Sequence, residues 1–124
     1  MTRTIRAFLF IEAASFATAA LVHFGVLTRG YEHQQAGTAE SAIAVVLLLG
    51  LAMSWTPVAS TRTAGLAAQA FALLGTLVGI FTIAVGVGPR TAPDIAYHLA
   101  IVVVLVAGLI VAARAPLAGS RQRA

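Results

Sequence analysis

The sequence predicts an all-α protein, an integral membrane four-helix bundle, and two observations lead to this class. The first is composition: 60% of the 124 residues are hydrophobic and 10% are charged, whereas a soluble domain usually carries about a quarter charged residues. The second is pattern: four long apolar segments are separated by short polar connections, and none alternates polar with apolar residues as a β-barrel strand would. We therefore expect one multi-pass domain in the cell membrane, surrounded by the lipid bilayer.

The length of each apolar segment supports this class, because about 20 apolar residues are needed to cross the hydrocarbon core. Pro57 and Pro93 lie where helices should end and begin, since proline lacks an N–H group and is tolerated in a first turn. The predicted spans cover residues 5–27, 38–58, 63–87 and 93–113.

The arginines predict the orientation of these spans, because short cytoplasmic connections carry an excess of basic residues. Arg29 and Arg90 fall on one side, and we therefore expect both termini in the cytoplasm, N-in and C-in. The arginines form no basic stripe with interleaved aromatic residues, so we expect no nucleic-acid partner. Six arginines fall on the cytoplasmic side: Arg3, Arg6, Arg62, Arg114, Arg121 and Arg123.

Polar residues inside the spans are the candidate functional residues, because such residues are costly in lipid and usually face the bundle interior. Helical spacing and the inferred topology sort them into two layers. The outer layer contains His23, Glu40, Asp94, Tyr97 and His98, and the inner layer contains Glu12, Ser15, Ser54 and Gln69.

The outer layer suggests a metal site between helix ends. His23 and His98 come from different spans and offer imidazole nitrogens, and Glu40 adds a carboxylate. Such a set can bind a zinc, iron or copper ion. Asp94 lies four residues before His98 and could accept its other ring N–H, beside Tyr97. A single haem b held by the two histidines has weaker support.

An alternative explanation of the outer layer needs no ligand. Asp94 and Glu40 fall near predicted helix starts, behind Thr91 and Thr38 as N-caps, where the helix dipole favours acidic residues. The histidines and the tyrosine would then mark the water interface.

The inner layer centres on Glu12, which lies too deep in the first span for a helix-end explanation. It could be a proton-coupled or cation-binding carboxylate. Alternatively, a neutral Glu12 could hydrogen-bond to Gln69 and a serine and join the helices.

The stretch AESAIAVVLLLGL, residues 39–51, resembles the second helix of DoxX-like membrane proteins, in which a glutamate precedes an apolar run ending in Leu-Leu-Gly-Leu. The chain length, the four spans and Gly108 late in the fourth span are also similar. The lysine expected near the outer end of the first helix is absent, and His23 and Arg29 are its nearest substitutes. The resemblance implies a small multipass protein, in some cases associated with membrane redox or sulfur metabolism.

Three functions follow from these residues. The first is a metal-binding or accessory membrane protein, the second a proton-coupled small transporter that uses Glu12, and the third a structural subunit of a membrane complex. The small residues of GTLVG, residues 75–79, allow close helix approach within the chain or in a homodimer. No cysteine and no arrangement of nucleophile, base and orienting group is visible, so an enzyme has the least support.

Overall fold

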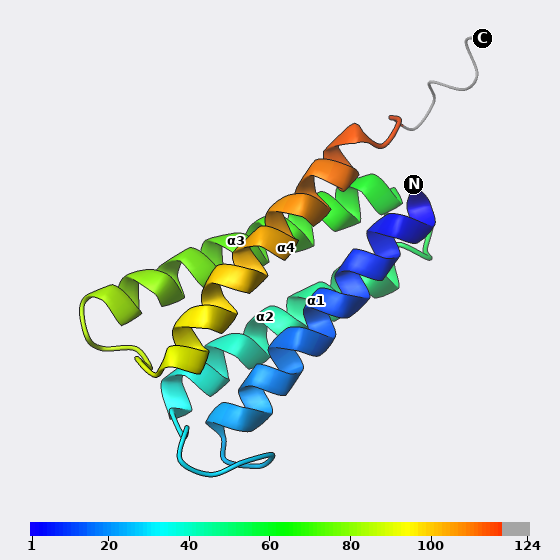
Figure 1. Cartoon of the computed structure of the whole chain (residues 1–124). Coiled ribbons are helices and arrows are strands. Elements are labelled where there is room, and N and C mark those ends of the chain that lie inside the picture. Colours follow the sequence, from blue (N-terminus) through cyan, green and yellow to red (C-terminus); the bar gives the residue numbers. More distant parts are fainter. Residues whose placement is uncertain (118–124) are drawn as a thin grey trace, which may run out of the picture.

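The structure is a computed structural model that describes residues 1–117, and these residues form four helices (Figure 1). Each helix is long and apolar enough to cross a membrane, which confirms the predicted all-α, four-helix architecture. The first three helices begin two to four residues earlier than predicted, and they end three to five residues earlier. The helices are α1 (Thr2–His23), α2 (Gln34–Met53), α3 (Thr61–Ala84) and α4 (Ala92–Arg114).

The helices run up and down in sequence, so the N-terminus and the end of α4 lie at the same end of the bundle (Figure 1). α1 packs on α2, α2 on α3 and α3 on α4, and α1 also contacts α3 and α4. Within residues 1–117, no Cα atom of α2 comes within 8 Å of one in α4. Any link between α2 and α4 must therefore be made by long side chains.

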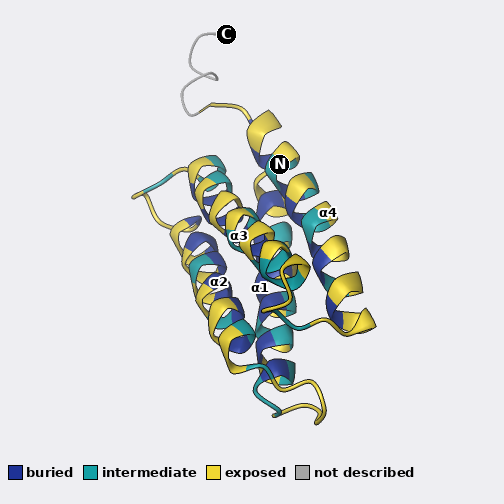
Figure 2. Ribbon diagram, turned by 90° about the vertical axis from the view of Figure 1, so that its left-hand side faces the viewer, coloured by how far each residue is buried: buried dark blue, intermediate teal, exposed yellow. Residues whose placement is uncertain are grey.

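The core runs along the inward faces of the four helices (Figure 2). Leu9, Leu47 and Leu105 have no exposed surface and come from α1, α2 and α4. α3 approaches through small residues instead: a Cβ added to Gly50 would lie 2.5 Å from the Cβ of Ala68. α2 and α3 are therefore closely packed at this point.

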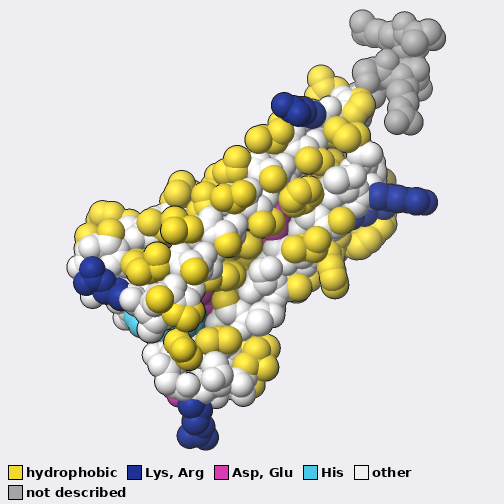
Figure 3. Space-filling view, in the orientation of Figure 1, with side chains coloured by type: hydrophobic (Ala, Val, Ile, Leu, Met, Phe, Trp, Pro, Cys, Tyr) yellow, Lys and Arg dark blue, Asp and Glu magenta, His cyan; other side chains and the backbone are white. Residues whose placement is uncertain are grey.

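The outer surface of the bundle is apolar, and the arginine side chains project at its two ends (Figure 3). Large side chains such as Phe10, Leu74 and Val103 are more than 60% exposed. A water-soluble bundle would place charged residues there instead. The surface therefore suits contact with lipid chains. Arg121 and Arg123, which the sequence assigns to the cytoplasmic side, lie outside the described residues.

The side chain of Arg6 bonds to α2 at the end of the bundle that carries the N-terminus. Its Nε donates to the hydroxyl of Ser54 at 3.0 Å, and its Nη2 donates to the Ser54 carbonyl at 2.5 Å. The guanidinium also lies 4.9 Å from the ring centroid of Trp55, a cation–π distance. These contacts join the start of α1 to the end of α2.

Candidate functional site

The imidazole of His23 bridges two carboxylates at the opposite end of the bundle. Its Nδ1 lies 2.7 Å from Oε2 of Glu40, and its Nε2 lies 2.9 Å from Oδ1 of Asp94. All three side chains are buried. They come from α1, α2 and α4, so the His23 side chain links the two helices that do not pack on each other. We call these three residues the outer cluster.

Asp94 is fixed by the start of α4. Thr91 and Asp94 form a capping box, in which Oδ2 of Asp94 accepts from the Thr91 backbone N–H at 3.1 Å and from the Thr91 hydroxyl. The predicted N-cap role of Thr91 and the first-turn position of Asp94 are thus confirmed. Both oxygens of Asp94 accept hydrogen bonds, which favours the carboxylate form. Because a carboxylate only accepts, Nε2 of His23 carries a hydrogen, and a second proton lies between Nδ1 and Glu40.

Glu40 does not lie in a first turn, so the predicted capping role of Thr38 is wrong. α2 begins at Gln34, and His33 is its N-cap, with the ring nitrogen Nδ1 accepting from the Ala36 N–H at 3.2 Å. The histidine provides a cap that the usual Ser, Thr, Asp or Asn pattern does not identify. Glu40 therefore stands in the second turn, where only its contact with His23 explains it. Its other oxygen, Oε1, is buried and has no hydrogen-bond partner among the described residues.

His98 lies close to the outer cluster without joining it. Its Nδ1 bonds to the backbone carbonyl of Asp94 at 2.7 Å, while the Asp94 carboxylate turns to His23 instead. Its Nε2 lies beside α3, 3.2 Å from where a Cβ on Gly79 would stand. The structure thus brings His23 and Glu40 together but gives His98 another partner. Across residues 1–117, no three His, Asp or Glu side chains are grouped to hold a metal ion.

Tyr97 lies between the outer cluster and the core. Its ring packs edge-on against Phe16 and His98, with ring centroids 6.1 and 5.6 Å away. Its hydroxyl is buried and has no hydrogen-bond partner in the described part of the chain. A buried phenol without a partner is uncommon, because the hydroxyl loses its hydrogen bonds to water.

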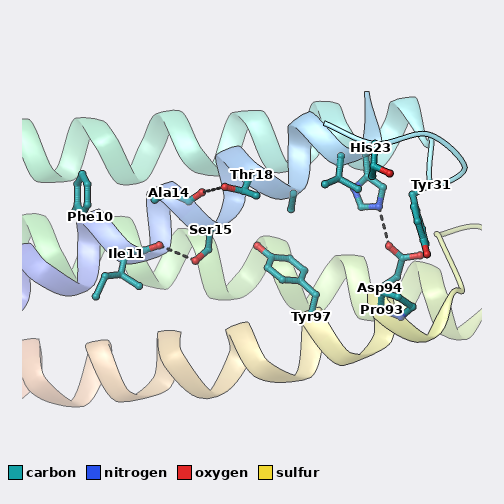
Figure 4. Close-up of a pocket in the computed structure, with 13 residues that line it drawn as sticks. Phe10, Ile11, Ala14, Ser15, Thr18, His23, Tyr31, Pro93, Asp94 and Tyr97 are labelled. Atoms are coloured by element: carbon teal, nitrogen blue, oxygen red, sulfur yellow. Dashed lines mark hydrogen bonds and ion pairs between the residues drawn. The ribbon is translucent and has the colours of Figure 1, made fainter. Parts of the chain in front are cut away.

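A cavity of about 720 Å³ opens between α1 and α4 beside the outer cluster, and we call it the outer cavity (Figure 4). Asp94 and His23 close one end, and Tyr97 points from α4 toward α1 across it. The rest of its wall is mainly apolar, and much of it lies on exposed positions of α1. Its lining residues are Phe10, Ile11, Ala14, Ser15, Thr18, Ala19, Val22, His23, Thr28, Tyr31, Pro93, Asp94 and Tyr97.

Sequence reasoning did not identify this cavity. Phe10 and Tyr31 line it from α1 and from the α1–α2 connection, 21 positions apart in the sequence. Their spacing carries no signal, because the cavity arises where two helices separate. The one sequence feature that points to the cavity is the pair of exposed aromatic residues, Phe10 on α1 and Tyr31 in the α1–α2 connection.

A second cavity, of about 150 Å³, lies beside Glu40 and His98, and we call it the loop cavity. Glu40 lines it from α2, Thr76 from α3 and His98 from α4, and residues 87–89 border it. His33 links the start of α2 to the α3–α4 connection, because its Nε2 lies 3.2 Å from the Val87 carbonyl. The two carboxylates of the outer cluster therefore line different cavities.

The α1–α2 connection is held by a local turn. Oε2 of Glu32 accepts from the backbone N–H of Gly30 at 2.7 Å. Backbone N–H groups around the carboxylate, together with the charge of Arg29, hold the pKa of Glu32 below its usual value. Gly25 and Gly30 adopt positive φ angles of 71° and 95°, which glycine tolerates best.

In the inner layer the structure places Glu12 and Gln69 in one fully enclosed region. Both have no exposed surface. A Cβ added to Gly108 would touch the Gln69 amide oxygen, and it would lie 2.7 Å from Oε1 of Glu12. Both polar groups therefore converge on the space that the glycine of α4 leaves free. Among the described residues, neither the Glu12 oxygens nor the Gln69 amide atoms have a hydrogen-bond partner.

The two serines of the predicted inner layer lie elsewhere. The hydroxyl of Ser15 donates to the Ile11 carbonyl at 2.8 Å, and the side chain lines the outer cavity. Ser54 bonds to Arg6 at the end of α2. The inner layer thus reduces to Glu12 and Gln69.

The small residues of GTLVG serve packing inside the bundle. Gly79 lies against His98, and Gly75 lies against Ile43 of α2.

No protein-family model, curated protein or solved structure matches this chain. The resemblance to DoxX-like proteins stays a prediction, and the function must be inferred from the site itself.

Proposed function

We propose that this chain is a multi-pass membrane protein, with both termini in the cytoplasm, that binds a lipid-soluble small molecule in the outer cavity. The observation that carries the proposal is the shape and lining of that cavity. It has a volume of about 720 Å³ and lies between α1 and α4. His23 and Asp94 form an ion pair at one end of it, with Nε2 and Oδ1 2.9 Å apart. Binding sites for small molecules typically combine an apolar wall with a few such polar groups.

The orientation rests on the arginines. Arg6 and Arg62 lie at the end of the bundle with the N-terminus, and Arg62 reaches the carbonyl of Ala113 at 3.4 Å. Arg29 and Arg90 lie in the connections at the other end. The larger number of arginines is expected on the cytoplasmic side, which would leave the outer cluster near the opposite surface of the membrane.

Lipid provides the access route to the cavity. Phe10, Ile11, Ala14 and Thr18 are exposed on α1 and also line the cavity. A molecule dissolved in the bilayer could therefore enter sideways, without crossing the polar connections. Such a molecule would meet the side chain of Tyr97 and, at one end of the cavity, the pair formed by His23 and Asp94.

The experiment is to purify the protein in lipid nanodiscs, extract bound molecules and identify them by mass spectrometry. Ala14→Phe would fill the cavity from α1, and Ala100→Phe would add the same ring on an exposed face of α4 outside both cavities. The proposal expects one species enriched in the parent and in Ala100→Phe and depleted in Ala14→Phe. Equal lipid extracts from all three would contradict it.

A metal ion bound by His23, Glu40 and His98 is the second candidate, favoured by the 2.7 Å contact of His23 with Glu40. It requires one carboxylate to leave a ring nitrogen of His23 and the ring of His98 to turn toward them. Elemental analysis of the purified parent and of His98→Ala tests it directly. Near-stoichiometric zinc, iron or copper only in the parent would favour this candidate over the lipid-soluble ligand, and iron would call for a haem spectrum.

A further inference from the structure

We propose that the end of the bundle with the N-terminus binds the phosphate group of an anionic phospholipid, between Arg3 and Arg6 of α1 and beside Trp55. This lipid site lies at the opposite end of the bundle from the outer cluster, and it does not depend on the ligand proposed for the outer cavity. It follows from the distribution of charge along the bundle and from the contacts that hold Arg6.

The positive charges at this end have no acidic partner in the chain. The chain has four acidic residues; three lie at the other end of the bundle, and the fourth, Glu12, has no exposed surface. Both ion pairs found within residues 1–117 belong to His23, so no arginine in this range is paired with a carboxylate. The counter-charge must therefore come from outside the protein. The arginines at this end, at the starts of α1 and α3 and the end of α4, are Arg3, Arg6, Arg62 and Arg114.

The guanidinium of Arg6 is held in place by its neighbours. Ser54 accepts hydrogen bonds from Nε and Nη2, and the ring of Trp55 lies 4.9 Å away on one face. A guanidinium has five N–H donors, and the Nη1 group of Arg6 has no partner in the described part of the chain. Because the fork is already oriented, little conformational freedom is lost when it binds a further acceptor.

Arg3 adds a second guanidinium on the same side of α1. Residues three apart are neighbours on a helix surface, with Cβ atoms about 5–6 Å apart. Arg3 is exposed, and it makes no hydrogen bond or ion pair with another residue of the range 1–117. The N–H groups of a guanidinium match the oxygens of a phosphate. Two arginines one turn apart can therefore bind a single phosphate group.

The surroundings favour the phosphate of a lipid over one dissolved in water. The α2–α3 connection at this end exposes Trp55 and Val58, which are 61% and 78% accessible. Tryptophan is enriched at the level of the lipid headgroups, where one side of the ring meets hydrocarbon and the other meets water. A headgroup between the arginines would place its acyl chains along the apolar surface of the bundle.

The charge distribution also selects among headgroups. A zwitterionic headgroup brings a cation with its phosphate, and this end of the bundle has no exposed acidic side chain within residues 1–117 to receive that cation. A headgroup with a net negative charge brings no such cation. Each basic residue near a membrane surface increases the attraction for anionic lipid about fivefold.

The test uses the protein in nanodiscs that contain equal amounts of phosphatidylglycerol and phosphatidylcholine with the same acyl chains. Native mass spectrometry of the released protein counts the lipids that remain bound. We expect phosphatidylglycerol to be retained in about tenfold excess or more, because two arginines contribute. Equal retention of the two lipids would overturn the proposal.

Three variants locate the site. Arg3→Gln removes a side chain without contacts that the fold requires, and it should reduce the excess about fivefold. Arg6→Gln should reduce it at least as much, and its thermal unfolding is measured alongside because the bonds to Ser54 are also lost. Arg29→Gln is the matched control at the other end of the bundle and should leave the excess unchanged. Equal losses in all three variants would show attraction by net charge alone and would contradict the site.

A last measurement separates a lipid from a soluble phosphate. Glycerol phosphate carries the same anion without acyl chains, and an excess of it should leave bound phosphatidylglycerol in place. Displacement of the lipid by glycerol phosphate would overturn the lipid site and assign the two arginines to a water-soluble phosphate instead.

Discussion

The outer cluster and the Glu12–Gln69 pair are both sets of buried polar side chains, but they differ in whether those side chains have hydrogen-bond partners. In the outer cluster every acid touches the imidazole of His23, at 2.7 and 2.9 Å. In the inner pair neither side chain has a hydrogen-bond partner within residues 1–117. The outer cluster borders two cavities, whereas the inner pair lines neither. The comparison shows that the paired acids border the cavities, whereas the unpaired side chains are enclosed.

The inner pair is best understood as neutral. A carboxylate without a counter-charge or hydrogen bond is strongly disfavoured in an apolar core, and such a group takes up a proton. The hydrogen bonds predicted from Glu12 to Gln69 and to a serine are not present within residues 1–117, where Ser15 and Ser54 have other partners. A substitution that keeps the shape of Glu12 should therefore cost little, whereas removal of the His23 ring should cost much.

The largest effect is expected from His23→Ala. It leaves Glu40 and Asp94 buried without their common partner, which should lower the free energy of unfolding by about 3–5 kcal/mol. Thermal unfolding in nanodiscs measures it. His33→Ala removes a histidine that caps α2 and should cost only about 1 kcal/mol. Equal losses in the two variants would show that the outer cluster carries no special charge balance.

Gly108→Ala should produce the next largest effect. The added methyl group would overlap the space onto which Glu12 and Gln69 converge, and overpacking of this kind costs about 1–3 kcal/mol. Gly75→Ala is the matched control, because its methyl group would meet one apolar side chain, Ile43 at Cδ1 and Cγ1, and no buried polar group. A Gly108→Ala protein as stable as this control would mean that the inner pair is loosely packed.

Glu12→Gln should be nearly silent, within about 1 kcal/mol by chemical unfolding, because an amide replaces a neutral acid of the same shape. The transporter hypothesis expects a different result, namely loss of proton coupling with the fold intact. Proton uptake into vesicles by the parent and the variant decides between them: unchanged uptake excludes Glu12 as the coupling residue, and marked instability contradicts a neutral Glu12.

The smallest effect concerns Glu32 in the exposed α1–α2 connection. Its pKa is held below the usual value of 4.5, so its stabilising contribution is complete above that pH. The contribution is lost as the pH falls through the lowered pKa. A carboxyl NMR titration should find the lowered pKa, and Arg29→Gln, which removes the neighbouring positive charge, should raise it by a small amount toward 4.5. A parent pKa at or above 4.5 would contradict the turn described here.

Much of the fold follows from local sequence. The four helices are predicted because apolar runs of span length can satisfy their backbone only as helices. The Thr91–Asp94 cap also follows from residue type and spacing, which act within a single turn. The sequence pattern predicts a start of α2 at residue 38 instead of Gln34, because His33 is an unusual cap and nothing in the pattern marks it. That error moved Glu40 into a first turn and suggested a capping role it does not have.

What the sequence by itself determined is which residues are too polar for their surroundings: Glu12, His23, Glu40, Gln69, Asp94 and His98. Local periodicity places each of them along its helix, because helix geometry is fixed residue by residue. Only the tertiary structure shows that the Asp94 carboxylate contacts the ring of His23 rather than that of His98. The cavity between α1 and α4 is likewise visible only there. Those features depend on the crossing of helices and on small residues such as Gly79, against which His98 packs, because they set distances between segments that share no local pattern.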